Sequence, residues 1–422
     1  MTTNGVRTGS RWPLHALLAA NAISGVGNKL TALAIPWFVL ETTGSAARTG
    51  LVGFFTVIPV ILSAIFGAGL VDRLGFKRMS IISDLLSGLT VGLIPLLHLS
   101  VGLAFWQLLV LVFLGSILDA PGATARQSLF PDVATAAGVR LERANAVAAT
   151  IWRLSFLLGP VLGGLLISLI GTSNVLWIDA ASFGVSALLV AEALPADRRS
   201  QPMDASHSKV GVLTNMMDGL RFIASDRLLL LLAISSTIGN ALGGAMNTIV
   251  LPVFARQSFG DAGALGLMLG AFGAGALSSA ALYGLVGYRV SKWLVFVVSG
   301  ILSIVPIWVL ATTPPLPIAI AALAVEGLAS GPYGPIVSTI YQRRIPVEQR
   351  ARFFGAILAA DNALTPLMVL GIGLLLSTTN LTTVLILLAF AKLSIKLAVV
   401  TRPILRRMDD DDGNVPRPDA VS

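Results

Sequence analysis

Residues 85–118 read LLSGLTVGLIPLLHLSVGLAFWQLLVLVFLGSIL and contain no Asp, Glu, Lys or Arg. A helix that crosses a bilayer needs about 20 mostly apolar residues, so this run holds most of two such helices and a short turn. The run is continuously apolar rather than alternating, which excludes a transmembrane β-barrel. The stretch therefore predicts consecutive membrane-spanning helices.

Charge-free runs of this kind recur along the whole chain. They predict twelve spanning helices, at residues 12–40, 48–71, 79–99, 104–120, 145–169, 174–193, 227–250, 263–286, 293–312, 316–340, 353–376 and 380–401. The fold class is therefore an all-α polytopic membrane protein. The apolar run after Trp12 is too long for the core of a cleaved signal peptide and is expected to be an uncleaved first span.

Composition supports this class and excludes others. Of 422 residues, 55% are hydrophobic and 12% are charged, and mean hydropathy is +0.84. A soluble domain carries roughly a quarter charged residues, so a soluble enzyme is excluded. There is no cysteine, phosphate-binding loop or hydrolase string. We therefore expect no enzyme activity and no cofactor. His15 and His98 fall near predicted helix ends, so we also expect no metal site.

Lysine and arginine are distributed unevenly between the two predicted sides of the membrane. With both termini in the cytoplasm, the outer loops hold only Arg48 and Arg256, and the other loop cations lie inside. Because inner loops of membrane proteins are enriched in these residues, we predict a multi-pass protein of the inner cell membrane in this orientation. The net charge of +8 is thus a topology signal and not a sign of nucleic-acid binding. Tryptophans near predicted helix ends are expected to be interface anchors rather than binding residues: Trp12, Trp37, Trp106 and Trp177.

A hydrophilic insertion at residues 195–226 divides the chain nearly in half. It predicts an N-terminal six-helix half at 1–194, a cytoplasmic linker at 195–226, a C-terminal half at 227–402 and a disordered tail at 403–422. Apolar residues after Lys209 recur at helical spacing. They fit either a helix on the inner membrane surface or a solvated helix packed on the neighbouring half.

The two halves resemble each other at a constant offset of 215–216 residues. Ile35-Pro36-Trp37-Phe38 matches Leu251-Pro252-Val253-Phe254, Lys77 matches Lys292, and Gln127 and Pro131 match Gln342 and Pro346. A repeat of six helices gives parallel halves with a substrate site at their interface near the midplane. Shared ancestry without transport is the alternative.

The loop after the second helix reads Gly69-Leu70-Val71-Asp72-Arg73-Leu74-Gly75-Phe76-Lys77-Arg78. A tight turn requires Gly75, and Asp72 can face cations or the positive end of a neighbouring helix. Such contacts can hold one half of the protein against the other. The cations Arg73, Lys77 and Arg78 alone would fit an ordinary positive inner loop.

The predicted fifth helix carries Gly159-Pro160 and Gly163-Gly164, preceded by Ser155. Glycines four residues apart let helices approach closely, and Pro160 removes one backbone donor and favours a bend. The pattern predicts a packing seam.

These two segments resemble motifs of the major facilitator superfamily. The loop is similar to the family's G-x-L-a-D-R-x-G-R-K motif at Leu70, Asp72, Arg73, Gly75 and Lys77, and departs from it at Ala68 and Phe76. The Gly-Pro-x-x-Gly-Gly string resembles the antiporter motif of the family's fifth helix. The resemblance implies the major facilitator fold, with two pseudo-symmetric halves, a conformational switch at the loop, and export.

A narrower resemblance is to macrolide efflux proteins and enterobactin-type siderophore exporters. It rests on Asp119-Ala120-Pro121, Arg126-Gln127-Ser128-Leu129-Phe130-Pro131 and Ala144-Asn145-Ala146. The chain departs from many relatives at Asn28, where an acid is common, and its fourth helix lacks the mid-membrane arginine of drug–proton antiporters. Proton coupling therefore cannot be assigned to either position.

Ionisable residues at membrane depth are functional candidates because they are costly to bury. Glu326 is the deepest and is expected to carry coupling or bind substrate, or else to form a structural ion pair, with Asp361 next. Lys29 could bind an anionic substrate or replace the missing acid. Further candidates are Arg153, expected to pair with a carboxylate of the fourth or tenth helix, and Asp179. Asp179 lies near the outer end of its predicted helix, and Asp84 and Asp119 lie near the inner surface, so hydrated or capping roles are expected for all three. Snorkelling is expected for Lys392 and Lys396.

The sequence thus predicts a transporter that exports a moderately hydrophobic small molecule, of the drug, macrolide or siderophore class, by proton antiport. Its cavity would be lined mainly by the first, fourth, seventh and tenth helices. Its expected partners are the substrate, protons and lipid, with no nucleic acid, and it is expected to be a monomer. Uptake or proton-independent diffusion is one alternative, and a non-transporting receptor or assembly factor is another.

Overall fold

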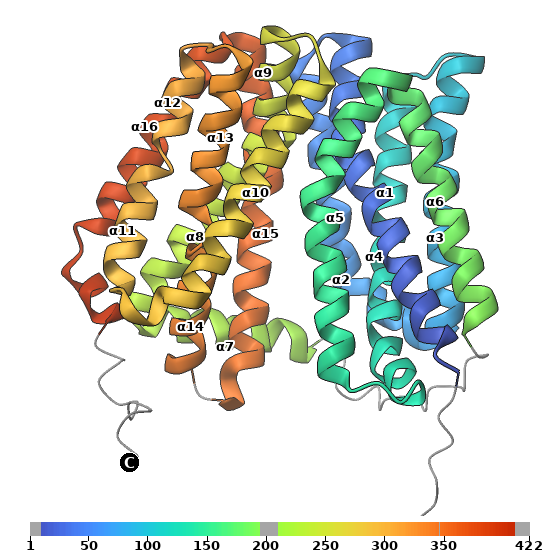
Figure 1. Ribbon diagram of the computed structural model, residues 1–422, viewed down its shortest axis with the longest axis horizontal. Helices are drawn as coiled ribbons and strands as arrows, with labels where there is room; N and C mark the ends of the chain where they lie inside the picture. The colour runs from blue at the N-terminus through green and yellow to red at the C-terminus, as the bar shows by residue number, and fades with distance from the viewer. Residues whose placement is uncertain (1–9, 195–209, 346, 410–422) are drawn as a thin grey trace, which may run out of the picture. The chain divides into compact units, whose positions relative to one another are not determined.

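The computed structural model describes residues 10–194, 210–345 and 347–409, and these residues are almost entirely helical (Figure 1). The first part contains α1 Trp12–Thr43, α2 Ala46–Leu74, α3 Phe76–Ser100, α4 Phe105–Ala136, α5 Leu141–Ile170 and α6 Thr172–Ala193. The second part contains α7 Val210–Ser225, α8 Arg227–Ala245, η2 Met246–Val250, α9 Leu251–Ser258, α10 Ala262–Val286, η3 Gly287–Arg289, α11 Lys292–Leu302, α12 Val305–Ala311, α13 Leu316–Ser330, α14 Tyr333–Arg344, α15 Val347–Thr378, α16 Leu381–Val400 and η4 Pro403–Met408.

Twelve helical stretches of the described chain are long and apolar enough to cross a membrane. The predicted all-α, twelve-span fold class is therefore confirmed. Within the described ranges the chain forms no strand.

Three of the spans are interrupted where the sequence predicted single helices. Pro252 and Pro306 lie in the first turns of α9 and α12, and Gly331-Pro332 separates α13 from α14. Proline has no amide hydrogen to donate to the preceding turn, and its ring clashes with the carbonyl four residues earlier. Helical geometry therefore changes at these points while the chain keeps its direction across the membrane.

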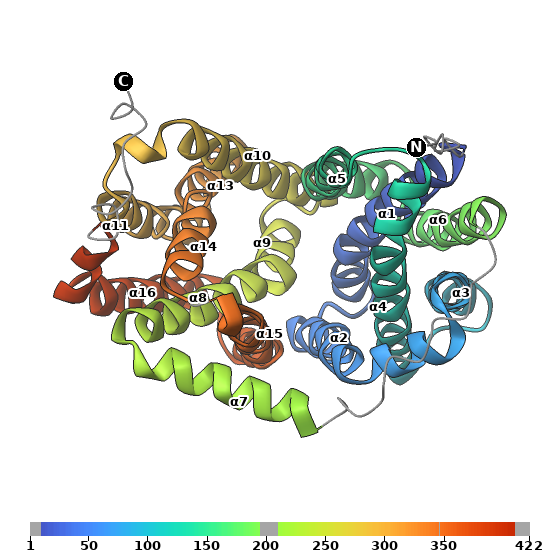
Figure 2. The same cartoon turned by 90° about the horizontal axis from the view of Figure 1, so that it is seen from below.

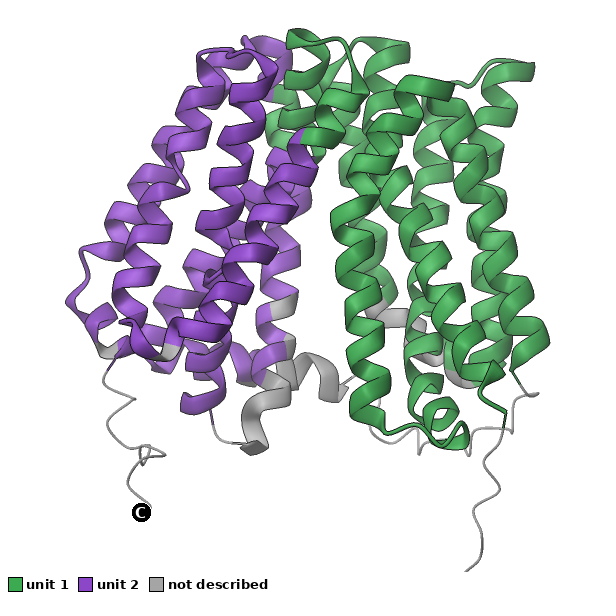
Figure 3. Ribbon diagram, viewed as in Figure 1, with its two compact units in different colours: residues 1–205, 248–267, 369–374 green, residues 206–247, 268–368, 375–422 purple. Residues whose placement is uncertain are grey.

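The chain forms two compact units (Figure 3). Unit 1 comprises residues 1–205, 248–267 and 369–374, so two short segments of the second sequence half pack with α1–α6. Within it α3 packs against α4 and α6, and α1 against α5 and α6 (Figure 2). Unit 2 comprises residues 206–247, 268–368 and 375–422. These boundaries follow packing, whereas the predicted halves follow the sequence repeat.

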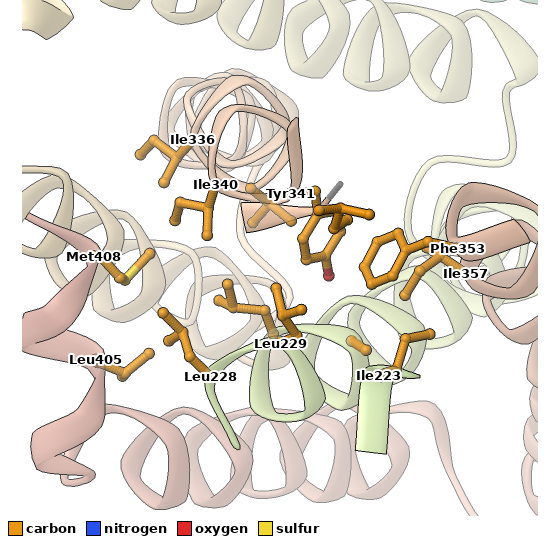
Figure 4. Packing of buried hydrophobic residues seen from close by; sticks show 14 of the residues in the cluster. Ile223, Leu228, Leu229, Ile336, Ile340, Tyr341, Phe353, Ile357, Leu405 and Met408 are labelled. Atoms are coloured by element: carbon orange, nitrogen blue, oxygen red, sulfur yellow. The ribbon is translucent and has the colours of Figure 1, made fainter. Parts of the chain in front are cut away.

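An apolar cluster in unit 2 joins α7, α8, α14, α15 and η4. Figure 4 labels Ile223, Leu228, Leu229, Ile336, Ile340, Tyr341, Phe353, Ile357, Leu405 and Met408 of this cluster. Ile223 is 4% exposed, whereas Met217 and Leu220 on α7 are 47% and 43% exposed. One face of α7 thus packs on the rest of unit 2, and Met217 and Leu220 remain exposed.

The prediction of disorder from residue 403 is wrong for the first residues of that segment. Residues 403–408 form η4, whose Leu405 and Met408 are fully buried. The Asp409 carboxylate accepts hydrogen bonds from the Ser291 hydroxyl at 2.6 Å and the Lys292 amide at 2.7 Å. It therefore caps α11 and holds η4 in place. The rest of the tail, from residue 410, lies outside the described residues, as do residues 195–209 of the linker.

Candidate functional site

The turn between α2 and α3 requires glycine at residue 75. Gly75 has φ +83°, a conformation that side chains disfavour, and its amide donates to the Val71 carbonyl at 2.9 Å. Arg73 and Arg78 are exposed. Asp72 lies at the end of α2, but its side chain is outside the described part of the structure.

Lys77 contacts the end of α6. Its ammonium donates to the carbonyl oxygens of Ala191, at 2.7 Å, and of Leu194. Cations are favoured at the C-terminal end of a helix, where carbonyls lack partners. This predicted gate residue therefore holds α3 against α6 inside unit 1.

The α5 motif packs on two different helices. A Cβ at Gly159 would lie 2.4 Å from Cβ of Lys29 on α1, and one at Gly163 would meet Leu30 at 3.5 Å. A Cβ at Gly164 would lie 2.5 Å from the Ala262 carbonyl and 2.8 Å from Gly266 Cα, both on α10. The predicted packing seam is thus present, and its last glycine permits backbone-to-backbone contact.

A second glycine pair repeats this arrangement. A Cβ at Gly50 on α2 would lie 2.9 Å from Gly373 Cα on α15, and one at Gly373 would lie 2.8 Å from Gly50 Cα. Unit 1 therefore holds the segments 248–267 and 369–374 through glycine contacts on α5 and α2.

Polar groups complete the α5–α10 contact. The Ser168 hydroxyl donates to the Asp261 carboxylate, and the Gly263 amide donates to the Ser168 oxygen at 2.9 Å and to Asp261 at 3.0 Å. Asp261 precedes α10 and lies outside the spanning segments. The hydrogen bond from Ser168 lowers the pKa of Asp261 below its ordinary value of 3.8.

We predict that this contact is insensitive to pH across the physiological range. A lowered pKa means that the stabilisation by the carboxylate is present above pH 3.8 and is lost only as pH falls below that value. Asp261→Asn should therefore lower the melting temperature by the same amount at pH 5.5 and at pH 8, because the wild-type carboxylate is ionised at both. A loss that shrinks as pH falls within that range would contradict the prediction.

A buried ion pair lies among α3, α4 and α6. Arg126 contacts the Asp84 carboxylate at 2.6 Å, and the two side chains are 4% and 0% exposed. The hydroxyl of Ser186 donates to Asp84 at 2.7 Å, and Arg126 donates to Ser80 at 3.2 Å. The expectation that Asp84 is hydrated is therefore wrong, because α6 and Arg126 enclose it.

Two more carboxylates approach α1. Asn28 donates to Asp119 Oδ2 at 3.2 Å, while Asp119 Oδ1 is buried with no hydrogen-bond partner in the described part of the chain. Asp179 on α6 is 0% exposed and accepts hydrogen bonds from Thr31 and Ser182, so the expectation that it is hydrated is wrong. The predicted candidates Asn28 and Asp179 thus lie on contacts of α1 with α4 and with α6.

Lys29 lies on α1 beside α5. Its ammonium is 5.2 Å from the centre of the Phe156 ring. Among the described residues it has no ion pair, and the same holds for the exposed Arg153, which was expected to pair with a carboxylate. Phe156 in turn stacks on Trp152, with ring centres 5.8 Å apart and an interplanar angle of 23°.

In unit 2, Glu326 on α13 forms an ion pair with Lys392 on α16 at 2.8 Å, and the side chains are 13% and 19% exposed. Lys392 also donates to the Ser303 carbonyl at 2.7 Å, so it is engaged inside the unit instead of snorkelling. Asp361 on α15 accepts hydrogen bonds from Thr237 at 2.9 Å and Ser236 at 3.2 Å. Sequence reasoning missed the Glu326–Lys392 and Asp84–Arg126 pairs, because their members come from distant segments.

The arrangement of helices, seams and buried charges can be compared with known proteins. The family model described as Major Facilitator Superfamily matches residues 17–242 and 234–416. The chain belongs to this superfamily. It is 32% identical to "Multidrug efflux pump Tap" of Mycolicibacterium fortuitum, over 94% of this chain and 98% of that protein.

Two further comparisons extend this result. The chain is 22% identical to "Macrolide efflux protein A" of Streptococcus pyogenes, over 82% of this chain and 85% of that protein. The crystal structure of the nucleoside transporter NupG superposes with a TM-score of 0.72 at 16% identity, covering 92% of this chain and 98% of that one. The superfamily, which the loop and α5 motifs indicated, and its efflux branch, which the segments at residues 119–131 and 144–146 indicated, are thus confirmed. The chain is a multi-pass cell-membrane protein of a transporter family with small-molecule substrates.

Proposed function

We propose that this superfamily member is a secondary active transporter that exports moderately hydrophobic small molecules of the drug, macrolide or siderophore class. The observation that carries the proposal is the Gly-Pro-x-x-Gly-Gly string of α5, whose Gly164 packs backbone to backbone on α10. The 32% identity to a multidrug efflux pump supports the same direction of transport. Both termini would lie in the cytoplasm, as the loop cations suggest. The protein would act as a monomer.

Proton antiport is the proposed coupling, with Glu326 as the proton carrier. A proton on Glu326 would cancel the carboxylate charge and release Lys392, which alters the contact between α13 and α16. Protonation would thereby be linked to helix packing within unit 2. Asp361 is the second candidate. In the contacts described above, its carboxylate accepts hydrogen bonds from two hydroxyl groups of α8 and has no cation as a partner.

We further propose that the α2–α3 loop acts in the conformational switch between the two access states. Gly75 fixes the turn and Lys77 fixes the start of α3 against α6. The exposed Arg73 and Arg78 lie beside this turn. The loop would thus move together with α3 and α6 as one body.

Glu326→Gln should reduce substrate accumulation driven by a pH gradient at least tenfold, because the neutral side chain cannot exchange a proton. The measurement is uptake into vesicles with an acidic lumen, using purified protein and a panel of lipophilic cations, macrolides and siderophores. Glu192→Gln, at the exposed end of α6, is the matched control and should retain wild-type uptake.

The outcomes separate the alternatives. Unchanged uptake in a folded Glu326→Gln variant would show that Glu326 is not the proton carrier. Asp361→Asn then tests whether Asp361 carries the proton. Uptake that ignores the gradient favours the proton-independent or uptake facilitator, an alternative motivated by Asn28 where relatives carry an acid. No movement of any panel compound favours a receptor or assembly factor.

A further inference from the structure

The unit-1 surface formed by Lys29, Phe156 and Trp152 combines a cation with two stacked rings. Phe156 and Trp152 are 43% and 64% exposed, although both lie in the middle of the α5 sequence rather than at a helix end. The other tryptophans discussed above were expected at interfaces because they fall near helix ends. Trp152 therefore needs a different explanation.

The direction of these rings follows from the contacts of α5. At 3.6 residues per turn, Phe156 lies about 60° round the helix from Gly159 and about 80° from Gly164. Gly159 packs on α1 and Gly164 packs on α10. Phe156 thus points into the narrower sector between these two neighbours, and Trp152 lies about 40° from Phe156 on the side of α1. The exposed rings therefore lie in the sector of about 140° between the two packing glycines of α5, on the side of α1, and not in the wider remaining sector of the helix surface.

Within the described chain, the two cations beside these rings have no carboxylate partner. Lys29 has only the Phe156 ring as a partner for its ammonium, and Arg153, beside Trp152, also has no carboxylate partner within the described chain. A cation over a ring is worth about 0.5–2 kcal/mol, which is less than the cost of holding a charge at membrane depth. An anionic group bound beside Lys29 and the two rings would supply the missing partner.

We propose that Lys29, Phe156 and Trp152 bind the transported substrate, and that the site selects amphipathic molecules with a planar aromatic body and an anionic group. The aromatic body stacks on Trp152 and Phe156, and the anion pairs with Lys29. This inference rests on the proposed export function and specifies its substrate class. Cationic molecules are disfavoured at this site, because Lys29 and Arg153 repel them.

Two xanthene dyes test the charge preference while keeping the aromatic body similar: anionic fluorescein and cationic rhodamine 6G. Binding to purified protein is measured by fluorescence anisotropy. Lys29→Gln should weaken fluorescein binding at least tenfold and leave rhodamine 6G within twofold, and Lys29→Arg should restore fluorescein to within threefold. Trp152→Leu should weaken fluorescein about fivefold through lost stacking.

Matched controls and a second reporter keep the test decisive. Arg48, 5.2 Å from the Phe105 ring, is a comparable cation–ring pair elsewhere in unit 1, and Trp106 is 65% exposed at the start of α4. Arg48→Gln and Trp106→Leu should leave both dyes within twofold. If Lys29→Gln does not fold, Trp152→Cys in this cysteine-free chain provides the reporter. Fluorescein, at a concentration well above the fivefold-weakened Kd expected without the Trp152 ring, should slow alkylation of this cysteine by a maleimide at least fivefold.

The proposal is overturned if Lys29→Gln binds fluorescein as wild type does, if both dyes weaken equally, or if fluorescein fails to protect Trp152→Cys. Vesicle transport distinguishes this failure from failure of the export function. If rhodamine 6G is transported but fluorescein is neither bound nor transported, the export function is supported and the anionic binding site is refuted. If fluorescein binds through Lys29 but no compound is transported, the binding site is supported and the export function is refuted.

Discussion

Gly164→Ala should reduce transport at least tenfold while Gly163→Ala, one residue earlier, leaves it within twofold. A Cβ at Gly164 would lie 2.5 Å from the Ala262 carbonyl, whereas one at Gly163 would meet only Leu30 and Leu33 at ordinary distances of 3.5–3.8 Å. The first is a backbone contact and cannot yield by a side-chain rotation. The methyl group therefore has to push α5 and α10 apart.

The size of this effect follows from the cost of overpacking, which is about 1–3 kcal/mol. If the α5–α10 contact belongs to one of two access states, this cost shifts their balance by roughly a factor of 5–150. The expected signature is lost transport with a small change in melting temperature, because the rest of unit 1 is untouched. Equal activities of the two alanine variants would contradict the assignment of this contact to the transport cycle.

Gly266→Ala provides an independent check from the other helix. Its Cβ would lie 2.6 Å from the Pro160 carbonyl, so the same loss is expected from α10. Because the two residues touch, the double variant should lose little more than either single variant.

Arg126→Leu is expected to cause the largest loss of stability, about 3–5 kcal/mol, because it leaves the fully buried Asp84 carboxylate without a cation. The measurement is the melting temperature and the yield of monodisperse protein. The double variant Asp84→Ala, Arg126→Leu removes both charges and should recover more than half of the loss. Removing Ser186 or Ser80 alone should cost far less.

A partly exposed pair in unit 2 supplies the control. Arg344 and Asp226 lie 3.4 Å apart with side chains 22% and 34% exposed. Asp226→Ser keeps the capping oxygen at the start of α8 and removes the ion pair, so we expect a loss of about 1 kcal/mol or less. If Arg126→Leu were no more destabilising than Asp226→Ser, Asp84 would not be held as a buried ion.

The candidate charges show where sequence reasoning reached its limit. Position along a span predicted which groups lie at membrane depth, and Glu326 and Asp361 were found this way. Depth along one helix does not say which neighbouring helix faces the group. Asp84 lies near the start of α3 and was expected to be hydrated, yet α6 covers it and Arg126 reaches it from α4.

Apolar run length determined the twelve helices, because a helix that satisfies its own backbone is the form that crosses a bilayer as a continuous apolar run. The spacing of Gly159, Gly163 and Gly164 likewise predicted close packing, and Gly75 predicted a turn. Which helix each glycine meets was decided only by the tertiary structure: α1 for the first two and α10 for Gly164. The same holds for the pairing of Glu326 with Lys392 and for the stacking of Trp152 on Phe156 beside Lys29. Such contacts join segments far apart in the chain, and local periodicity carries no information about which faces of two helices are brought together.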